Sequence, residues 1–185
     1  MNSEDLRQAL SRIGRAVRVG SSRGPLRVFE HLGITSYEPA HSRLLAWLLN
    51  PAESHGLGDA FLKGFWQCAF PEEHPESYTP ARVTAEEDLG GARPDIVVRG
   101  PSWRLIIEVK LRCQEHDDQT LKYAELSPGA KCVYLTIAGD CAQSRNFTSV
   151  RWSDVRRLLD ACPTGGEAEW LLRQFADHIA RNLEV

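Results

Sequence analysis

The chain has 185 residues, a formal net charge of −3 at pH 7 and 42% hydrophobic residues. This balance is typical of a globular protein with one core, and we expect a single domain over residues 1–185. No apolar run approaches 18 residues and the amino-terminal residues are acidic, so we expect no membrane span, no secretory signal and a cytoplasmic location. The five cysteines lack a C-x-x-C pair and the six histidines lack ligand spacing, which predicts reduced thiols and argues against zinc.

Helical patterns fill the first part of the chain. An amphipathic helix is predicted over residues 3–17, with most of its arginines outside the apolar stripe. A short helix follows, then a longer one that begins at His41 or Ser42, and another over 58–69. We therefore expect a helical N-terminal part over residues 1–70.

Strand patterns begin after a long polar loop. The segments rich in β-branched residues and bounded by turn residues are 82–87, the two arms of a hairpin over 94–110, 131–138 and 148–152. A helix separates the hairpin from the next strand, and two helices follow the last strand. This order predicts an α/β fold of α+β-like type, with a central mixed sheet over 82–152 and C-terminal helices over 153–185.

The hairpin brings three charged side chains to one face. A loop at the Gly-Pro turn pairs the arms so that Arg99 faces Arg104, and Asp95 then faces Glu108. Lys110 shares this face because it lies two residues beyond Glu108. Opposed carboxylates destabilise a sheet, and a cation between them removes that cost. The spacing therefore predicts a divalent-metal site of the kind that cleaves phosphodiesters.

Oxygen ligands of this kind suit Mg²⁺, which neutralises phosphate charge and activates water. Asp95 and Glu108 are the expected carboxylate ligands, and the Val109 carbonyl is a third candidate. Two nearby carboxylates raise the pKa of Lys110, so we expect it to orient water and stabilise charge rather than to act as the base. The identity of the base stays open.

Gln119 and Tyr123 lie one turn apart on the helix after the hairpin. Such a pair can hydrogen-bond a phosphate or brace the lysine. The alternative is a tyrosine at the edge of the core beside a solvated glutamine.

These polar residues resemble the motif of the PD-(D/E)xK nuclease superfamily. The residues that carry the resemblance are Asp95, preceded by Pro94, then Glu108, Val109, Lys110, Gln119 and Tyr123. Residues 41–51 and 55–59, which read HSRLLAWLLNP and HGLGD, resemble one bacterial branch of this superfamily. That branch usually has Asp where this chain has Asn50, a position we expect to end a helix.

The resemblance implies a restriction-endonuclease-like core, dependence on Mg²⁺ or Mn²⁺, and cleavage of DNA in defence, restriction or repair. In several relatives an acid or histidine from the first core helix joins the metal site, which makes Glu38 and His41 candidates here. Their alternatives are a helix-capping acid and a buried, satisfied histidine. Glu87 either faces the site or is solvated. His55 and Asp59 are expected to stabilise the glycine-rich turn, and the surface histidines are expected to be His74, His116 and His178.

Three functions compete at this stage. The first is a metal-dependent deoxyribonuclease, supported by the complete set of polar residues. The second is a catalytically silent module that binds nucleic acid or a partner protein, and the third is an RNA-directed nuclease or a subunit that needs a partner. Cleavage of both strands would favour a homodimer.

Overall fold

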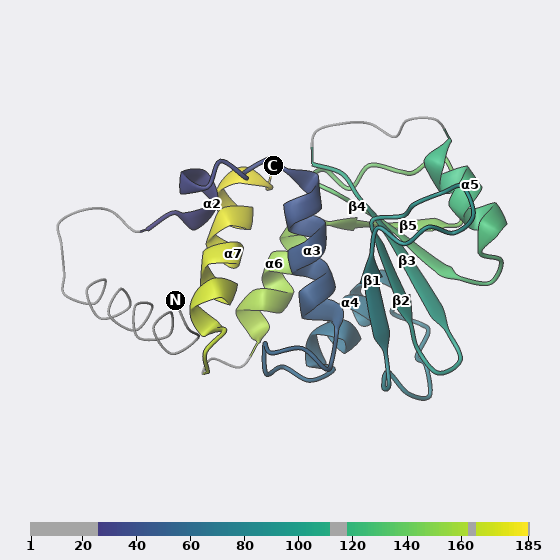
Figure 1. Cartoon of the computed structure of the whole chain (residues 1–185), viewed down its shortest axis with the longest axis horizontal. Coiled ribbons are helices and arrows are strands. Elements are labelled where there is room, and N and C mark those ends of the chain that lie inside the picture. Colours follow the sequence, from purple (N-terminus) through teal and green to yellow (C-terminus); the bar gives the residue numbers. More distant parts are fainter. Residues whose placement is uncertain (1–25, 112–117, 163–165, 185) are drawn as a thin grey trace, which may run out of the picture.

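The structure is a computed structural model that describes residues 26–111, 118–162 and 166–184 (Figure 1). The helix expected over residues 3–17 and His116 lie outside the described residues. Within those ranges the chain forms a five-stranded mixed sheet flanked by helices. The predicted fold class, a restriction-endonuclease-like α/β core, is therefore confirmed. No helix of the described part is long and apolar enough to cross a membrane.

The strands of the sheet lie side by side in chain order. They are β1 (Arg82–Ala85), β2 (Ile96–Arg99), β3 (Arg104–Val109), β4 (Lys131–Thr136) and β5 (Phe147–Arg151). The pairs β1–β2 and β2–β3 are antiparallel, whereas β3–β4 and β4–β5 are parallel. Strand β3 thus joins the hairpin to the parallel half of the sheet.

The helices cover the two faces of the sheet unequally (Figure 1). They are α2 (Val28–His31), α3 (Glu38–Leu49), α4 (Ala60–Ala69), α5 (Gln119–Leu126), α6 (Trp152–Ala161) and α7 (Glu169–Asn182). The large core lies between the sheet and the layer that contains α3, α4, α6 and α7. Helix α5 lies on the other face, where Tyr123 packs in a smaller cluster with residues of β3, β4 and β5. The polar face of the hairpin is the α5 face.

Helix α3 begins earlier than the sequence predicts. It starts at Glu38, not at His41 or Ser42, and Pro39 occupies its first turn. Proline is tolerated there because the amide that it lacks has no partner inside the helix. The earlier start places Glu38 at the amino-terminal end of a helix that packs against β1 and β2.

The hairpin has the predicted register. Arg99 pairs with Arg104 and Ile96 with Ile107, so the pairing continued by one residue sets Asp95 opposite Glu108. Both faces of the two strands are buried, apart from the half-buried Arg99 and Arg104 beside the turn. One face packs against the helical layer, and the other lies on the side of α5.

Gly100, in the hairpin loop, lies directly beneath the Trp103 ring. A Cβ atom on Gly100 would lie 2.0 Å from Cε2 of Trp103. The ring cannot easily move, because it packs edge-on against Trp66 at 4.9 Å and its Nε1 donates to the Ser77 carbonyl at 2.8 Å.

We predict that Gly100→Ala lowers the free energy of unfolding by about 1–3 kcal/mol, the usual cost of overpacking. Urea denaturation measures the change, and Ser102→Ala, an exposed position in the same loop, serves as the control. Equal stability of the two variants would show that the ring does not constrain the turn.

Candidate active site

Asp95 is fixed by the main chain of the strand that it faces. It lies just before β2, and its Oδ2 accepts a hydrogen bond from the Val109 amide at 2.7 Å. The Asp95 carbonyl accepts from the Glu86 amide at 2.9 Å. The first contact holds the carboxylate against the end of β3, and the second joins the main chain of Asp95 to the residue after β1.

Glu108 and Lys110 form an ion pair with 2.8 Å between Oε1 and Nζ. The side chain of Glu108 is 3% exposed and that of Lys110 is 12% exposed. The second oxygen of Glu108, Oε2, is buried and has no hydrogen-bond partner. An unpaired buried carboxylate oxygen is unfavourable, and it is a vacant position for a cation or a donor.

Burial dominates the ionisation of both carboxyl groups. It raises the pKa of Glu108 to about 7; Asp95 adds to this shift and Lys110 opposes it. Burial also raises the pKa of Asp95 to about 6, against the lowering effect of the Val109 amide and Lys110. For Lys110, burial lowers the pKa, but Glu108 and Asp95 outweigh it, so the net pKa is raised. The raised pKa favours the protonated, cationic form of Lys110.

Glu38 reaches the site from the start of α3. Its Oε1 accepts the Leu111 amide at 2.8 Å, directly after the Glu108–Lys110 segment. Its charge raises the pKa of Asp95 and that of Lys110, which places it beside both groups. The structure thus brings Glu38 to the site, where it binds the main chain.

Helix α5 contributes Tyr123, as the sequence predicts. The Tyr123 hydroxyl, with one proton to donate, lies beside two acceptors. It is 3.1 Å from the Arg93 carbonyl, and its hydrogen bonding to Glu108 lowers the pKa of that group against the stronger effect of burial. Gln119 lies one turn earlier, and its Oε1 is buried without a hydrogen-bond partner. Tyr123 therefore lies beside the acid rather than the lysine.

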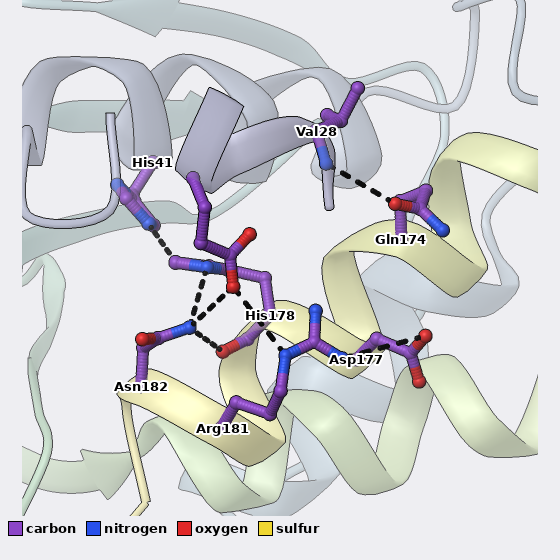
Figure 2. Close-up of polar contacts among 8 residues, drawn as sticks. Val28, His41, Gln174, Asp177, His178, Arg181 and Asn182 are labelled. Atoms are coloured by element: carbon purple, nitrogen blue, oxygen red, sulfur yellow. Dashed lines mark hydrogen bonds and ion pairs between the residues drawn. The ribbon is translucent and has the colours of Figure 1, made fainter. Parts of the chain in front are cut away.

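His41 points toward His178 of α7, within the helical layer (Figure 2). It is fully buried, its Nδ1 bonds the Tyr37 carbonyl at 3.0 Å, and its Nε2 lies 2.9 Å from Nε2 of His178. Both ring nitrogens are occupied, so the structure does not bring His41 to the metal site that the sequence suggested. His178 also corrects an expectation, since it is fully buried rather than at the surface.

Two neighbouring acids at the end of β1 have different surroundings. Glu87 accepts two hydrogen bonds of 2.6 Å from the Arg99 guanidinium, so its carboxylate is paired outside the candidate site. Glu86 is the neighbour of the site, because its charge raises the pKa of Asp95. The sequence analysis missed Glu86, which has a φ of +53°; this conformation breaks the alternation expected of a strand.

The glycine-rich turn between α3 and α4 is held by His55. The His55 ring accepts the Leu57 amide at Nδ1 (3.0 Å) and donates from Nε2 to the Asn50 carbonyl (2.8 Å). Asp59 forms an ion pair with Lys63 at 2.9 Å. His55 thus stabilises the turn, whereas the side chain of Asp59 pairs with the first turn of α4.

The donor set fits a hard divalent cation. A half-buried carboxylate, Asp95, and a buried one, Glu108, whose Oε2 has no hydrogen-bond partner, offer the ligand type that Mg²⁺ and Mn²⁺ prefer. Among residues 26–111, 118–162 and 166–184, no three His, Cys, Asp or Glu side chains gather closely enough to hold a metal ion. A metal held here would have Asp95 and Glu108 as ligands, with main chain, water or substrate completing its coordination.

Comparison with known proteins agrees with this geometry. A family model described as the PD-(D/E)XK nuclease superfamily matches residues 26–132, more than half of the chain. The chain belongs to the PD-(D/E)XK nuclease superfamily. The match contains α3, the hairpin and α5, and it ends at the second residue of β4. Membership indicates nuclease activity and the use of a divalent metal. No curated protein and no solved structure gives a significant match.

The raised pKa of Glu108 has a consequence for stability. The folded protein holds the Glu108 proton more tightly than the unfolded chain, so this contribution to stability is present below about pH 4.5 and is lost as the pH rises through about 7. We predict that Glu108→Gln, which stays neutral, is more stable than the parent at pH 8 without metal. The expected gain is roughly 2 kcal/mol, or about 5 °C in Tm.

Thermal unfolding in EDTA at pH 5 and pH 8 measures this difference, with the exposed Glu125→Gln as the control. Added Mn²⁺ should raise the Tm of the parent and leave that of Glu108→Gln unchanged. A gain that is equal at both pH values would contradict the assignment.

Proposed function

We propose that this superfamily member is a Mg²⁺-dependent nuclease that hydrolyses phosphodiester bonds of DNA, with Mn²⁺ able to replace Mg²⁺. The observation that supports this proposal is that the carboxylates of Asp95 and Glu108 lie opposite each other beside Lys110, and that one buried oxygen of Glu108 has no hydrogen-bond partner. A role in bacterial defence, restriction or repair follows from the resemblance in the upstream segment.

The charges around the site explain why a cation is needed. Three acids, Glu38, Asp95 and Glu108, act on the Lys110 ammonium group. Glu86 acts on Asp95 from the other side and pairs with Arg43 at 3.5 Å. A phosphodiester that approaches this excess of negative charge is repelled. Asp95, Glu108 and the Val109 carbonyl would hold the metal, which supplies charge neutralisation and a more acidic bound water.

Lys110 acts by charge and position. Its ammonium group is held by Glu108 at 2.8 Å and stays protonated, so it can stabilise charge that develops on a phosphate oxygen. The vacant Oε1 of Gln119 can accept a hydrogen bond from water. Tyr123 fixes Glu108 and the Arg93 carbonyl, which holds the acid in place during the reaction.

Glu38 is a positioning residue in this proposal rather than a metal ligand. Its bond to the Leu111 amide fixes the end of the segment that carries Glu108 and Lys110. The exposed side chains of Arg93 and Lys122 flank Asp95 and Tyr123 in the chain and are suited to contact backbone phosphates.

The test uses purified protein with plasmid, linear duplex, single-stranded DNA and RNA, each with Mg²⁺, Mn²⁺ or EDTA. We predict metal-dependent DNA cleavage that falls at least about 100-fold in Asp95→Asn and in Lys110→Ala. Glu87→Gln is the matched control, since this nearby acid pairs with Arg99 and should leave cleavage unchanged.

Other outcomes identify the competing functions. Cleavage of RNA alone would replace DNA as the substrate. Absence of cleavage together with binding that weakens steeply with salt would indicate a silent nucleic-acid-binding module. Full activity of Lys110→Ala would refute the role given to the lysine.

A further inference from the structure

The histidine pair behind the candidate site belongs to a directed chain of hydrogen bonds (Figure 2). Nδ2 of Asn182 lies 3.1 Å from Nδ1 of His178. The same nitrogen lies 3.2 Å from the His178 carbonyl and 3.3 Å from a carboxylate oxygen of Glu30. Both of these are acceptors only, so the atom is the amide nitrogen of Asn182, whose two protons are shared among three acceptors that include Nδ1 of His178.

The Tyr37 carbonyl fixes the protons of the two rings. It can only accept, so His41 carries its proton on Nδ1 and donates to this carbonyl at 3.0 Å. A neutral His41 then accepts at Nε2 from Nε2–H of His178 over 2.9 Å, which leaves Nδ1 of His178 as an acceptor facing Asn182. Both imidazoles are neutral, each in one tautomer. Burial lowers the pKa of His41 and that of His178, the latter to about 4, in keeping with this assignment.

The chain ends next to a residue that touches the candidate site. Tyr37 is the N-cap of α3, and Glu38, the next residue, accepts the Leu111 amide at 2.8 Å. The start of α3 is therefore held from two sides, by α7 through the histidines and by the end of β3 through Glu38. Helix α3 lies between α7 and the sheet (Figure 1).

Close packing around His178 and His41 leaves the two rings little room to move. His178 stacks on Phe29 with 4.4 Å between ring centroids, and His41 meets the edge of Trp152 at 5.8 Å. From the outer side, Glu30 of α2 lies 3.4 Å from Arg181 of α7. Close packing of this kind transmits a shift of one helix to the next.

We propose that His178 and His41 are positioning residues that couple the C-terminal helix α7 to the candidate nuclease centre through Tyr37 and Glu38. Helix α7 lies outside the segment matched by the superfamily model. The consequence of the coupling for cleavage rests on the proposed function, whereas its structural basis does not.

Hydrogen exchange of the Leu111 amide, followed by ¹⁵N NMR, tests the coupling without any assay of cleavage. We expect His178→Phe, which keeps a ring but cannot donate, to speed this exchange roughly tenfold, the effect of about one lost buried hydrogen bond. His178→Gln, whose amide can still donate, should restore protection. Glu38→Gln should change the same amide and so calibrates the direct effect.

Leu172→Ala is the matched control, because it weakens the packing of α7 without touching the chain of bonds. Exchange measured at the same interval below the Tm of each variant separates loss of the coupling from general destabilisation. Exchange of Leu111 that is the same in His178→Phe and Leu172→Ala under these conditions would overturn the proposal.

A second variant keeps the proposal testable if His178→Phe does not fold. Asn182 is exposed, so Asn182→Ala removes the donor to His178 and leaves the core intact. Imidazole ¹⁵N shifts should show the proton of His41 on Nδ1 and that of His178 on Nε2 in the parent. In the variant, loss of the Asn182 bond to His178 should speed the exchange of Leu111; opposite tautomers in the parent, or unchanged exchange in the variant, would refute the coupling.

The role in cleavage has its own readout. If the parent cleaves DNA, His178→Phe should lower kcat with little change in KM, since the substrate does not reach the histidines. If the parent cleaves nothing, the exchange result still stands, and the proposed function alone fails.

Discussion

The removal of Asp95 and Glu108 from water beside a single lysine is the constraint on which the site depends. Burial raises the pKa of both carboxyl groups, and Lys110 compensates only part of the cost. A structure keeps such an arrangement only when the surrounding elements hold it firmly. The hairpin register, the Val109 amide and Tyr123 are the elements that hold it here.

The remaining architecture serves to hold the end of β3. On one side β3 pairs in parallel with β4, and the Lys110 amide donates to the Leu135 carbonyl at 2.9 Å. On the other side Glu38, at the start of α3, accepts a hydrogen bond from the next amide, that of Leu111. The strand that carries the Glu-x-Lys segment is therefore bound at two successive residues beyond its last ladder position. This bonding explains how two flexible charged side chains can keep one geometry.

The helical layer is more than a cover for the apolar face of the sheet. Helix α3 contacts β1 and β2, and its buried His41 forms a hydrogen bond with His178 of α7. The matched superfamily segment ends at the second residue of β4, and α6 and α7 follow it in the chain. Helices outside a site can tune its stability without contacting its substrate.

The local parts of the site could be predicted from the sequence. Strand alternation and the turn between Arg99 and Arg104 were sufficient to place Asp95, Glu108 and Lys110 on one face, because a hairpin register depends only on nearby residues. The helical spacing likewise placed Gln119 and Tyr123 together. The resemblance added the fold and the superfamily.

Only the tertiary structure decided the roles of the neighbours. His41 was a candidate ligand until the fold set it against His178, 137 positions away. Glu86 rather than Glu87 lies by Asp95 because one residue takes a left-handed conformation. Glu38 reaches Leu111 because the helix starts at the residue before a proline. Periodicity describes the direction of a side chain within its own element, whereas the contact it makes depends on how elements distant in sequence pack together.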